Sequence, residues 1–404
     1  MEPLEVEGLR ESVSYEPVSV KELLVEMKDT SELLIDLAYS AVLHQSDQIA
    51  HEVLELEAKM KVLQVRARMS LMLAARSPDE AEALAPVLGV VEAADTIADA
   101  AGDIAKIVIE EIGLPPSMRG ALSTAVELLV RGTVADDSTW AGQTLEAIDL
   151  ESETGIRVIA VRRGDEWIRN PGPETRITAG DVTLLRGPEA AIGEVYERLT
   201  GEAYDPKPAP EPAMADLERA VDSIVLMKNL SELAVDLAYG AILFDDEALA
   251  REVANLEVEV DALQSRFEAW VLQAAAEADD PVALRGLIHL GVSTEVISDA
   301  AVSISEGVLR NIGVHPVVEL AVQESDELIA RVEIDANSEL AGTEIVEGVP
   351  AVDVSTSVIA IRRPEDGWLV GPDMDTRLRA GDVLITKGTR TSATEFESLA
   401  VSPD

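Results

Sequence analysis

The sequence contains two copies of one pattern, placed about 200 residues apart in a chain of 404 residues. The clearest matches are MKDTSEL at 27–33 with MKNLSEL at 227–233, IAVRR at 159–163 with IAIRR at 359–363, and AGDV at 179–182 with AGDV at 380–383. The last pair is one residue out of step because of a single insertion near Trp368. So many matches at one offset indicate a tandem duplication, and any fold for one half must also suit the other.

The first part of each copy has the apolar spacing of helices. In the first copy, apolar side chains recur three and four residues apart from about 18 to 113. Breaks at 44–47 and 77–79 divide this stretch into three helices, and Ser77 followed by Pro78 is a typical helix start. The pattern therefore predicts a compact antiparallel three-helix bundle.

The second part of each copy changes to short β-rich runs separated by turns. In the first copy these runs are 128–134, 155–161 and 182–185, with a turn at 179–181 and a short helix from about 141. We expect the α+β fold class, in which three-helix bundles alternate with small α/β domains and the whole unit is duplicated. The expected boundaries are a flexible tail at 1–15, a bundle at 16–115, an α/β domain at 116–200, a proline-rich linker at 201–213, a bundle at 214–315 and an α/β domain at 316–404.

The charge balance excludes some partners. The chain has 77 acidic and 32 basic residues, for a formal net charge of -45. So negative a protein repels nucleic acid phosphates and anionic lipid headgroups, and we expect no nucleic-acid binding. An acid-rich, lysine-poor surface is typical of halophilic proteins, because concentrated salt screens the self-repulsion. The alternative is a specialised cation-binding surface.

Enzymatic and membrane-spanning roles have little support in the sequence. No Ser/His/Asp or Cys/His set and no P-loop is present, and the four histidines do not match between the copies. No apolar run approaches the roughly 18 residues that a membrane-spanning helix needs. The acidic start carries no secretory signal, so we expect a soluble, cytoplasmic protein that is not an enzyme and does not insert into a membrane.

The small α/β domains resemble the C-terminal domain of potassium-conductance regulators, the RCK-C or TrkA-C family. The resemblance rests on the order and spacing of IAVRR and AGDV, found twice. It implies that two such domains pair and bind a small ligand in the cleft between them, often a cyclic dinucleotide such as cyclic di-AMP. The implied ligand-binding residues are Val158, Ile159, Arg162, Arg163, Val358, Ile359, Arg362 and Arg363. The alternative is that these arginines only neutralise acids near the strand ends. Because no G-x-G-x-x-G follows a predicted strand, NAD or ATP binding is not expected.

The helical parts resemble the three-helix bundles of the PhoU family, in which an acidic residue is followed four positions later by Asp. In that family such pairs hold metal clusters. The resemblance therefore implies divalent-metal ligands at Glu32, Asp36, Asp95, Asp99, Glu232, Asp236, Glu295 and Asp299. Glu92, Asp95, Asp99 and Asp103 share one helix face, where like charges repel and a hard cation with oxygen ligands would relieve the repulsion. The alternative is a solvated acidic face, and Ser303 interrupts the second copy of the ladder.

Two classes of function follow. The first is a regulatory protein that senses a cyclic dinucleotide or an ion through paired RCK-C domains and acts on a membrane transporter of potassium or phosphate. The second is a divalent-metal-binding PhoU-type scaffold or metal-dependent protein that uses its RCK-C domains for dimerisation. The sequence leaves open whether the RCK-C domains pair within one chain or between two chains of a homodimer.

Overall fold

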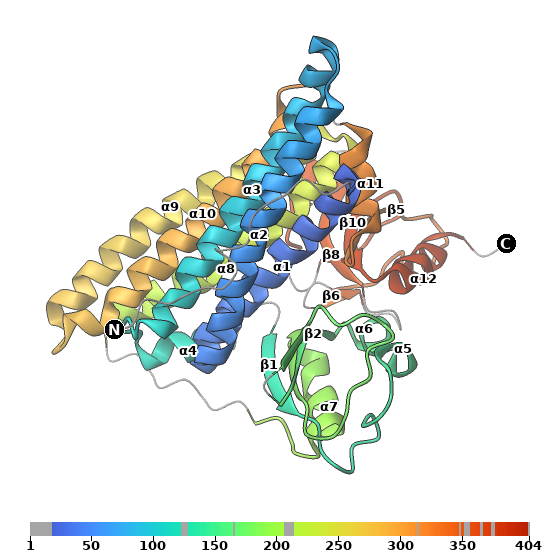
Figure 1. The fold of residues 1–404 in the computed structure, drawn as a ribbon. Helices are drawn as coiled ribbons and strands as arrows, with labels where there is room; N and C mark the ends of the chain where they lie inside the picture. The colour runs from blue at the N-terminus through green and yellow to red at the C-terminus, as the bar shows by residue number, and fades with distance from the viewer. Residues whose placement is uncertain are drawn as a thin grey trace. The chain divides into compact units, whose positions relative to one another are not determined.

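The computed structural model describes residues 18–122, 128–164, 166–205, 214–312, 315–346, 349–350, 356–363, 367–372 and 376–402. The predicted tail at 1–15 and most of the predicted linker, from 206 to 213, lie outside these residues. The chain forms two compact units (Figure 1). A helical unit takes Met1–Ala121 and Ala209–Asp326, and a β unit takes Leu122–Pro208 and Glu327–Asp404. Domains that alternate along the sequence are therefore sorted by type, helical with helical and β with β.

The helices of the first bundle begin close to where the sequence predicts, and α2 and α3 end three to four residues earlier than expected. Its long helices are α1 (Val20–His44), α2 (Asp47–Ala74) and α3 (Pro78–Ile109). Ser19 and Glu22 form a reciprocal capping box at the start of α1, and the Ser77 hydroxyl accepts a hydrogen bond from the Glu80 amide at the start of α3. These side chains satisfy amide groups that have no partner within a helix.

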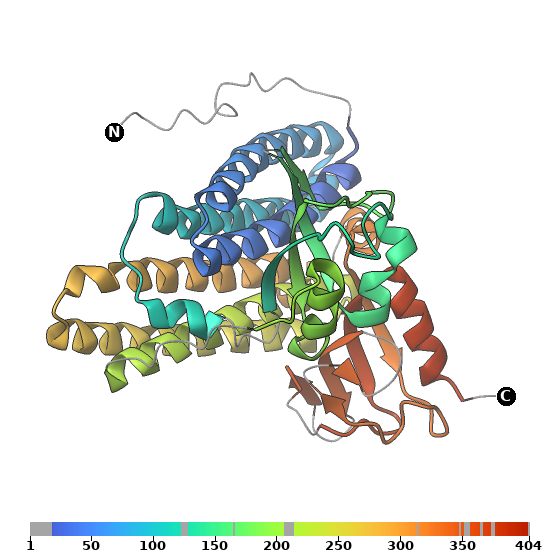
Figure 2. The ribbon, with the colours of Figure 1, turned by 90° about the horizontal axis from the view of Figure 1, so that it is seen from below.

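The second bundle repeats this arrangement and packs against the first. Its helices are α8 (Ala215–Phe244), α9 (Glu247–Glu277) and α10 (Arg285–Leu309), with a 3-10 turn η2 (Pro281–Leu284) before α10. The two bundles meet where α3 lies beside α10, which Figure 2 shows as the teal helix next to the orange one. The two bundles are in direct backbone contact near the start of α10, where the Gly286 amide donates to the Gly113 carbonyl at 2.8 Å. Two short helices, α4 (Pro116–Leu122) and α11 (Pro316–Glu324), follow the bundles, and α11 packs on α1 and α8.

One helical stretch meets the length and composition of a membrane span. Among the described residues, Pro281–Leu309 is long and apolar enough, although it also carries polar residues. More than half of its most apolar window is buried inside the protein, where α10 packs against α3, α8 and α9. That burial is the property of a core helix in a helical bundle.

In the part of the chain that the structure describes, each of the two domains of the β unit contains one four-stranded antiparallel sheet. The strand order is β1-β4-β2-β3 in the first domain and β5-β10-β8-β9 in the second, which is the same topology. The strands are β1 (Leu128–Thr133), β2 (Arg157–Arg163), β3 (Glu166–Arg169), β4 (Val182–Gly187), β5 (Leu328–Glu333), β8 (Ser357–Arg363), β9 (Gly367–Val370) and β10 (Val383–Gly388). A two-stranded hairpin, β6 (Ile345–Val346) and β7 (Val349–Pro350), belongs to the second domain. The predicted α+β architecture, duplicated as a whole, is confirmed.

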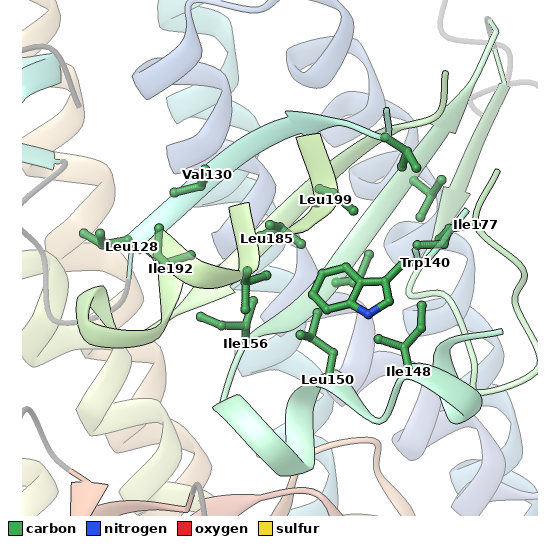
Figure 3. Packing of buried hydrophobic residues seen from close by; sticks show 14 residues of the cluster. Leu128, Val130, Trp140, Ile148, Leu150, Ile156, Ile177, Leu185, Ile192 and Leu199 are labelled. Atoms are coloured by element: carbon green, nitrogen blue, oxygen red, sulfur yellow. The ribbon is translucent and has the colours of Figure 1, made fainter. Parts of the chain in front are cut away.

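Helices cover one face of each sheet. The first domain has α5 (Leu145–Ile148), α6 (Leu150–Thr154) and α7 (Glu189–Thr200), and the second has α12 (Arg390–Ala400). In the first core, Trp140 lies among Ile148, Leu150 and Ile177, while Ile192 and Leu199 of α7 pack toward the sheet (Figure 3). Burial of this apolar surface holds sheet and helix together.

Candidate functional site

Strands β2 and β8, which carry the predicted ligand-binding residues, are mostly buried in their domains. Val158 of β2 and Val358 of β8 belong to the hydrophobic cores of their domains. Ile159 and Ile359 are also buried, outside those two clusters. The structure thus gives the two valines a packing role, and contact of any of these four side chains with a ligand stays a prediction.

Arg163 and Arg363 hold the Ala-Gly-Asp turn of their own domain. The Arg163 guanidinium donates to both carboxylate oxygens of buried Asp181, at 2.9 and 2.7 Å. Arg363 does the same with buried Asp382, at 3.2 and 3.4 Å. Burial alone would raise the pKa of Asp181, but the hydrogen bonds from Arg163 and Thr178 hold that pKa below its usual value. Both arginines therefore have a structural role in the turn, and their contact with a ligand stays a prediction.

Arg162 and Arg362 precede these two arginines in the chain, and only Arg362 is more exposed than the arginine that follows it. Arg162 is half-buried and donates to the Gly164 carbonyl at 2.6 Å. Arg362 is exposed, with its guanidinium 6.0 Å from the centroid of the Trp368 ring. An exposed arginine against an aromatic ring can bind phosphate and stack on a base at once.

Charged side chains from both β domains meet at Glu327, immediately before β5. Its carboxylate pairs with Arg157 at 3.4 Å, with Lys387 at 3.0 Å and with Arg186. The two arginines belong to the first domain, while Glu327 and Lys387 belong to the second. We call these four residues the Glu327 cluster. A second link, between the hydroxyls of Ser152 and Thr389 at 3.2 Å, also joins the two domains.

The sequence interpretation missed the Glu327 cluster, although one signal was present. Arg186 and Lys387 occupy matching positions, each directly before a glycine that ends the last strand of its sheet. A basic residue within the same strand of both copies, in so acidic a chain, could have indicated a site for an anionic partner. Its acidic partner could not be chosen from so many carboxylates.

In the second bundle, three carboxylates of α9 and α10 gather into one group. Glu257, Asp261 and Asp299 each offer an oxygen atom, and these atoms lie within 4.8 Å of one another. Glu295 lies beside them, and burial together with the charges of Asp299, Asp261 and Glu257 raises its pKa to about 6. Burial and the neighbouring acids also raise the pKa values of Glu257 and Asp299. Such repulsion favours either protons or a cation at this place.

The same place in the first bundle already contains a cation. Lys61 stands where the second copy has Asp261, and its ammonium lies 3.0 Å from Asp95 and in contact with Asp99. Lys106 pairs with Asp103 at 2.7 Å, where the second copy has Glu306 and Ser303. Asp95, Asp99 and Asp103 of α3 are therefore paired with lysines of the chain itself.

The acids predicted on the first helix of each bundle have other partners. Glu32 pairs with Lys28 at 2.8 Å, and Glu232 pairs with Lys228 at 2.7 Å. Each lysine is almost fully buried and lies over a tyrosine ring of the other copy, with distances of 5.2 and 5.3 Å to the ring centroids. Asp36 is buried and Asp236 half-buried.

Metal binding at the predicted α1 and α8 positions stays untested. The carboxylate group described above contains none of Glu32, Asp36, Glu232 and Asp236. It contains Asp299 of the predicted set, and it adds Glu257 and Asp261, which the sequence interpretation missed. The missed signal was a Glu followed four residues later by Asp on α9, the same spacing that was noted on α10.

Comparison with known families assigns all four parts of the chain. The PhoU domain family matches residues 24–108 and 224–308. The TrkA-C domain family matches residues 129–200 and 329–400. The chain is a tandem PhoU and TrkA-C protein. The resemblance noted in the sequence is thereby confirmed. Each PhoU match spans the three long helices of one bundle, and each TrkA-C match runs from the first strand of a sheet to its last helix.

The solved structures that resemble this chain are distant from it. A GsuK channel bound to NAD has 14% sequence identity and a TM-score of 0.17, over 70% of this chain and 57% of that chain. The GsuK RCK domain has the same identity and TM-score, over 88% of this chain and 84% of that one. The chain thus spans 57% of the length of the first of these proteins, and similarity this low supports no argument about function. No protein with a curated description matches the sequence significantly.

Proposed function

We propose that this chain is a non-enzymatic regulatory protein that senses a small ligand through its paired TrkA-C domains and acts on a membrane transporter of potassium. Its domain content supports a regulatory role in potassium transport. The observation that carries the proposal is that both TrkA-C domains lie in one compact unit and share the Glu327 cluster. A phosphate transporter is the alternative partner, because PhoU domains make up the rest of the chain.

The ligand that fits best is a cyclic dinucleotide such as cyclic di-AMP. Its phosphodiester groups need guanidinium donors, and its bases need aromatic or apolar surfaces. Arg362 with Trp368 offers both kinds of group in the second domain, and Arg162 stands at the matching position in the first. An ion is the other ligand class consistent with a regulator of this type. We place the protein in the cytoplasm, in concentrated salt that screens its net charge of -45.

The mechanism we propose is a shift between two arrangements of the paired domains. A ligand that touches both TrkA-C domains stabilises the arrangement in which it makes more contacts. Because each TrkA-C domain follows a PhoU bundle in the chain, that arrangement can be passed on to the bundles and to a bound transporter. Because both TrkA-C domains of one chain lie in one compact unit, we expect a monomer to bind ligand without a homodimer partner.

Thermal melting with cyclic di-AMP tests this proposal. Ligand that binds only the folded state stabilises it by about 2.7 kcal/mol at a hundred times the dissociation constant, so the melting midpoint should rise. The double variant Arg162→Gln/Arg362→Gln should lose most of the rise. Arg131→Gln is the matched control, because Arg131 is an exposed arginine on β1 of the first sheet. No rise for the unaltered protein with cyclic di-AMP would contradict the dinucleotide assignment.

The second candidate function is binding of a divalent cation by the second PhoU bundle. It is favoured by Glu257, Asp261 and Asp299, whose oxygens converge and whose neighbour Glu295 has a raised pKa. Carboxylate oxygens suit hard cations such as magnesium, calcium or manganese, and iron is also compatible. A calorimetric titration with manganese should give one site per chain, which Asp299→Ala removes and Asp99→Ala leaves in place. Binding that survives Asp299→Ala would exclude this site.

A further inference from the structure

Glu327 is a buried carboxylate that several cations share. Its side chain is 5% exposed, and the side chains of its partners Arg186, Lys387 and Arg157 are 9%, 13% and 15% exposed. Charges so far removed from water are costly unless each has close partners of opposite sign. Removing the carboxylate would therefore leave a strong local demand for another anion.

The cationic side chains of the cluster come from both TrkA-C domains. Arg186 and Lys387 are repeat mates from the last strands of the two sheets, and Arg157 opens β2 of the first sheet. Arg157 is also oriented by Asn170, whose side-chain oxygen accepts a hydrogen bond from it at 2.8 Å. Glu127, the repeat mate of Glu327, lies outside the described residues. The result is an anion-binding arrangement that neither domain could form alone.

Carboxylates and phosphates are interchangeable ligands for such an arrangement. A guanidinium group binds either one through paired hydrogen bonds, and an ammonium group attracts either as a point charge. We propose that Glu327 is an internal anion that holds this site in the ligand-free protein, and that a phosphate group of the regulatory ligand displaces it. This proposal rests on the proposed function. It assigns one phosphate subsite to Arg157, Arg186 and Lys387, separate from Arg162, which lies at the other end of β2.

The position of Glu327 in the chain gives its displacement a consequence. The preceding residue, Asp326, is the last residue of the helical unit, and its backbone amide donates to the Asp29 carboxylate of α1 at 3.2 Å. Glu324 is tied to α1 as well, through Lys21 at 2.7 Å. The peptide between Asp326 and Glu327 therefore links an anchor on α1 to the anion site. Because one peptide bond joins the two residues, we expect displacement of Glu327 to weaken the contact of the Asp326 amide with Asp29.

Inorganic phosphate is the probe that tests the displacement. In Glu327→Gln the competing carboxylate is gone, so phosphate should bind at least about tenfold more tightly than to the unaltered protein, as measured by calorimetry. The matched control is Glu333→Gln, which removes an exposed acid at the end of β5, the strand that follows Glu327, and should leave phosphate affinity unchanged. Equal or weaker phosphate binding in Glu327→Gln would overturn the proposal.

A second pair of variants protects the test against a folding defect. Arg186→Gln and Lys387→Gln, examined by circular dichroism for retained fold, should each weaken cyclic di-AMP binding by about tenfold or more. If the unaltered protein and Glu327→Gln bind cyclic di-AMP equally well, the displacement fails while the proposed function stands. If cyclic di-AMP never binds but phosphate binding rises in Glu327→Gln, the anion site stands and the dinucleotide assignment fails. Hydrogen exchange adds a readout of the link to α1, since the Asp326 amide should exchange faster in Glu327→Gln than in Glu333→Gln.

Discussion

The two PhoU bundles solve the same electrostatic problem in different ways. Both present acids on their last helix toward the helix before it, at Asp95 and Asp99 in one copy and at Glu295 and Asp299 in the other. In the first bundle, the Lys61 ammonium lies between Asp95 and Asp99 and pairs with both. The second bundle has Asp261 at that position and adds negative charge instead. One copy thus contains its own cation, whereas the other copy has the carboxylates that we propose bind a divalent ion.

The largest expected effect comes from giving the second bundle the residue of the first. Asp261→Lys places an ammonium among Glu257, Glu295 and Asp299, as Lys61 is placed in the first copy. The lysine side chain would fill the space of a divalent ion and compensate part of the negative charge of the remaining carboxylates, so manganese binding should be lost. Calorimetry measures the loss, and a variant that still binds manganese with unchanged affinity would show that the copies do not differ as described.

The reverse substitution should have the next largest effect. Lys61→Asp removes two ion pairs and creates a second acidic group, so the number of manganese ions bound per chain should rise from one to two. In the presence of a chelator the variant should be less stable by about 1 kcal/mol, since these ion pairs are partly exposed and screened. Lys59→Asp is the matched control, because Lys59 lies on the same helix and pairs with Glu26 instead. An unchanged stoichiometry in Lys61→Asp would contradict the comparison.

A smaller effect concerns the dependence of stability on pH. The pKa of Glu295 in the folded protein, about 6, lies above its ordinary value of 4.5, so the folded state binds more protons between these values. Stability should therefore fall as pH rises from about 4.5 through 6, when a chelator is present. Manganese, or the substitution Glu295→Gln, should flatten this part of the profile. Denaturant unfolding at several pH values measures the free energy of unfolding. If Glu295→Gln leaves its pH dependence unaltered, Glu295 is not the group responsible.

Local sequence signals predicted most of the fold. The helix boundaries at Ser77 and Pro78 followed from capping chemistry, which depends on neighbouring residues only. The three longer strands of each sheet followed from β-rich runs, whereas four-residue strands such as Glu166–Arg169 were too short to recognise. The sequence did not predict that the two bundles form one unit and the two TrkA-C domains another, because this arrangement depends on contacts between segments about 200 residues apart.

The sites were less predictable than the fold. Arg163 was predicted to bind ligand because both copies contain it. Both copies also contain its partner Asp181, and the structural role of the pair in the turn is enough to account for the repetition. Asp261 was overlooked because an acid at i+4 means little in a chain with 77 acidic residues. Glu327 gave no signal, since its partners lie on three different strands and across two domains. Repetition marks positions that both copies need, whereas the bundles differ in charge where the repeat is broken, as at Lys61 and Asp261.

The central claim is that one chain supplies a complete pair of TrkA-C domains for one ligand. Native mass spectrometry of the full chain with cyclic di-AMP, at low micromolar protein, tests this claim directly. We predict a single chain carrying one cyclic di-AMP, with no need for a second chain. Cyclic di-AMP found only on dimers, at one ligand for two chains, would contradict pairing within the chain.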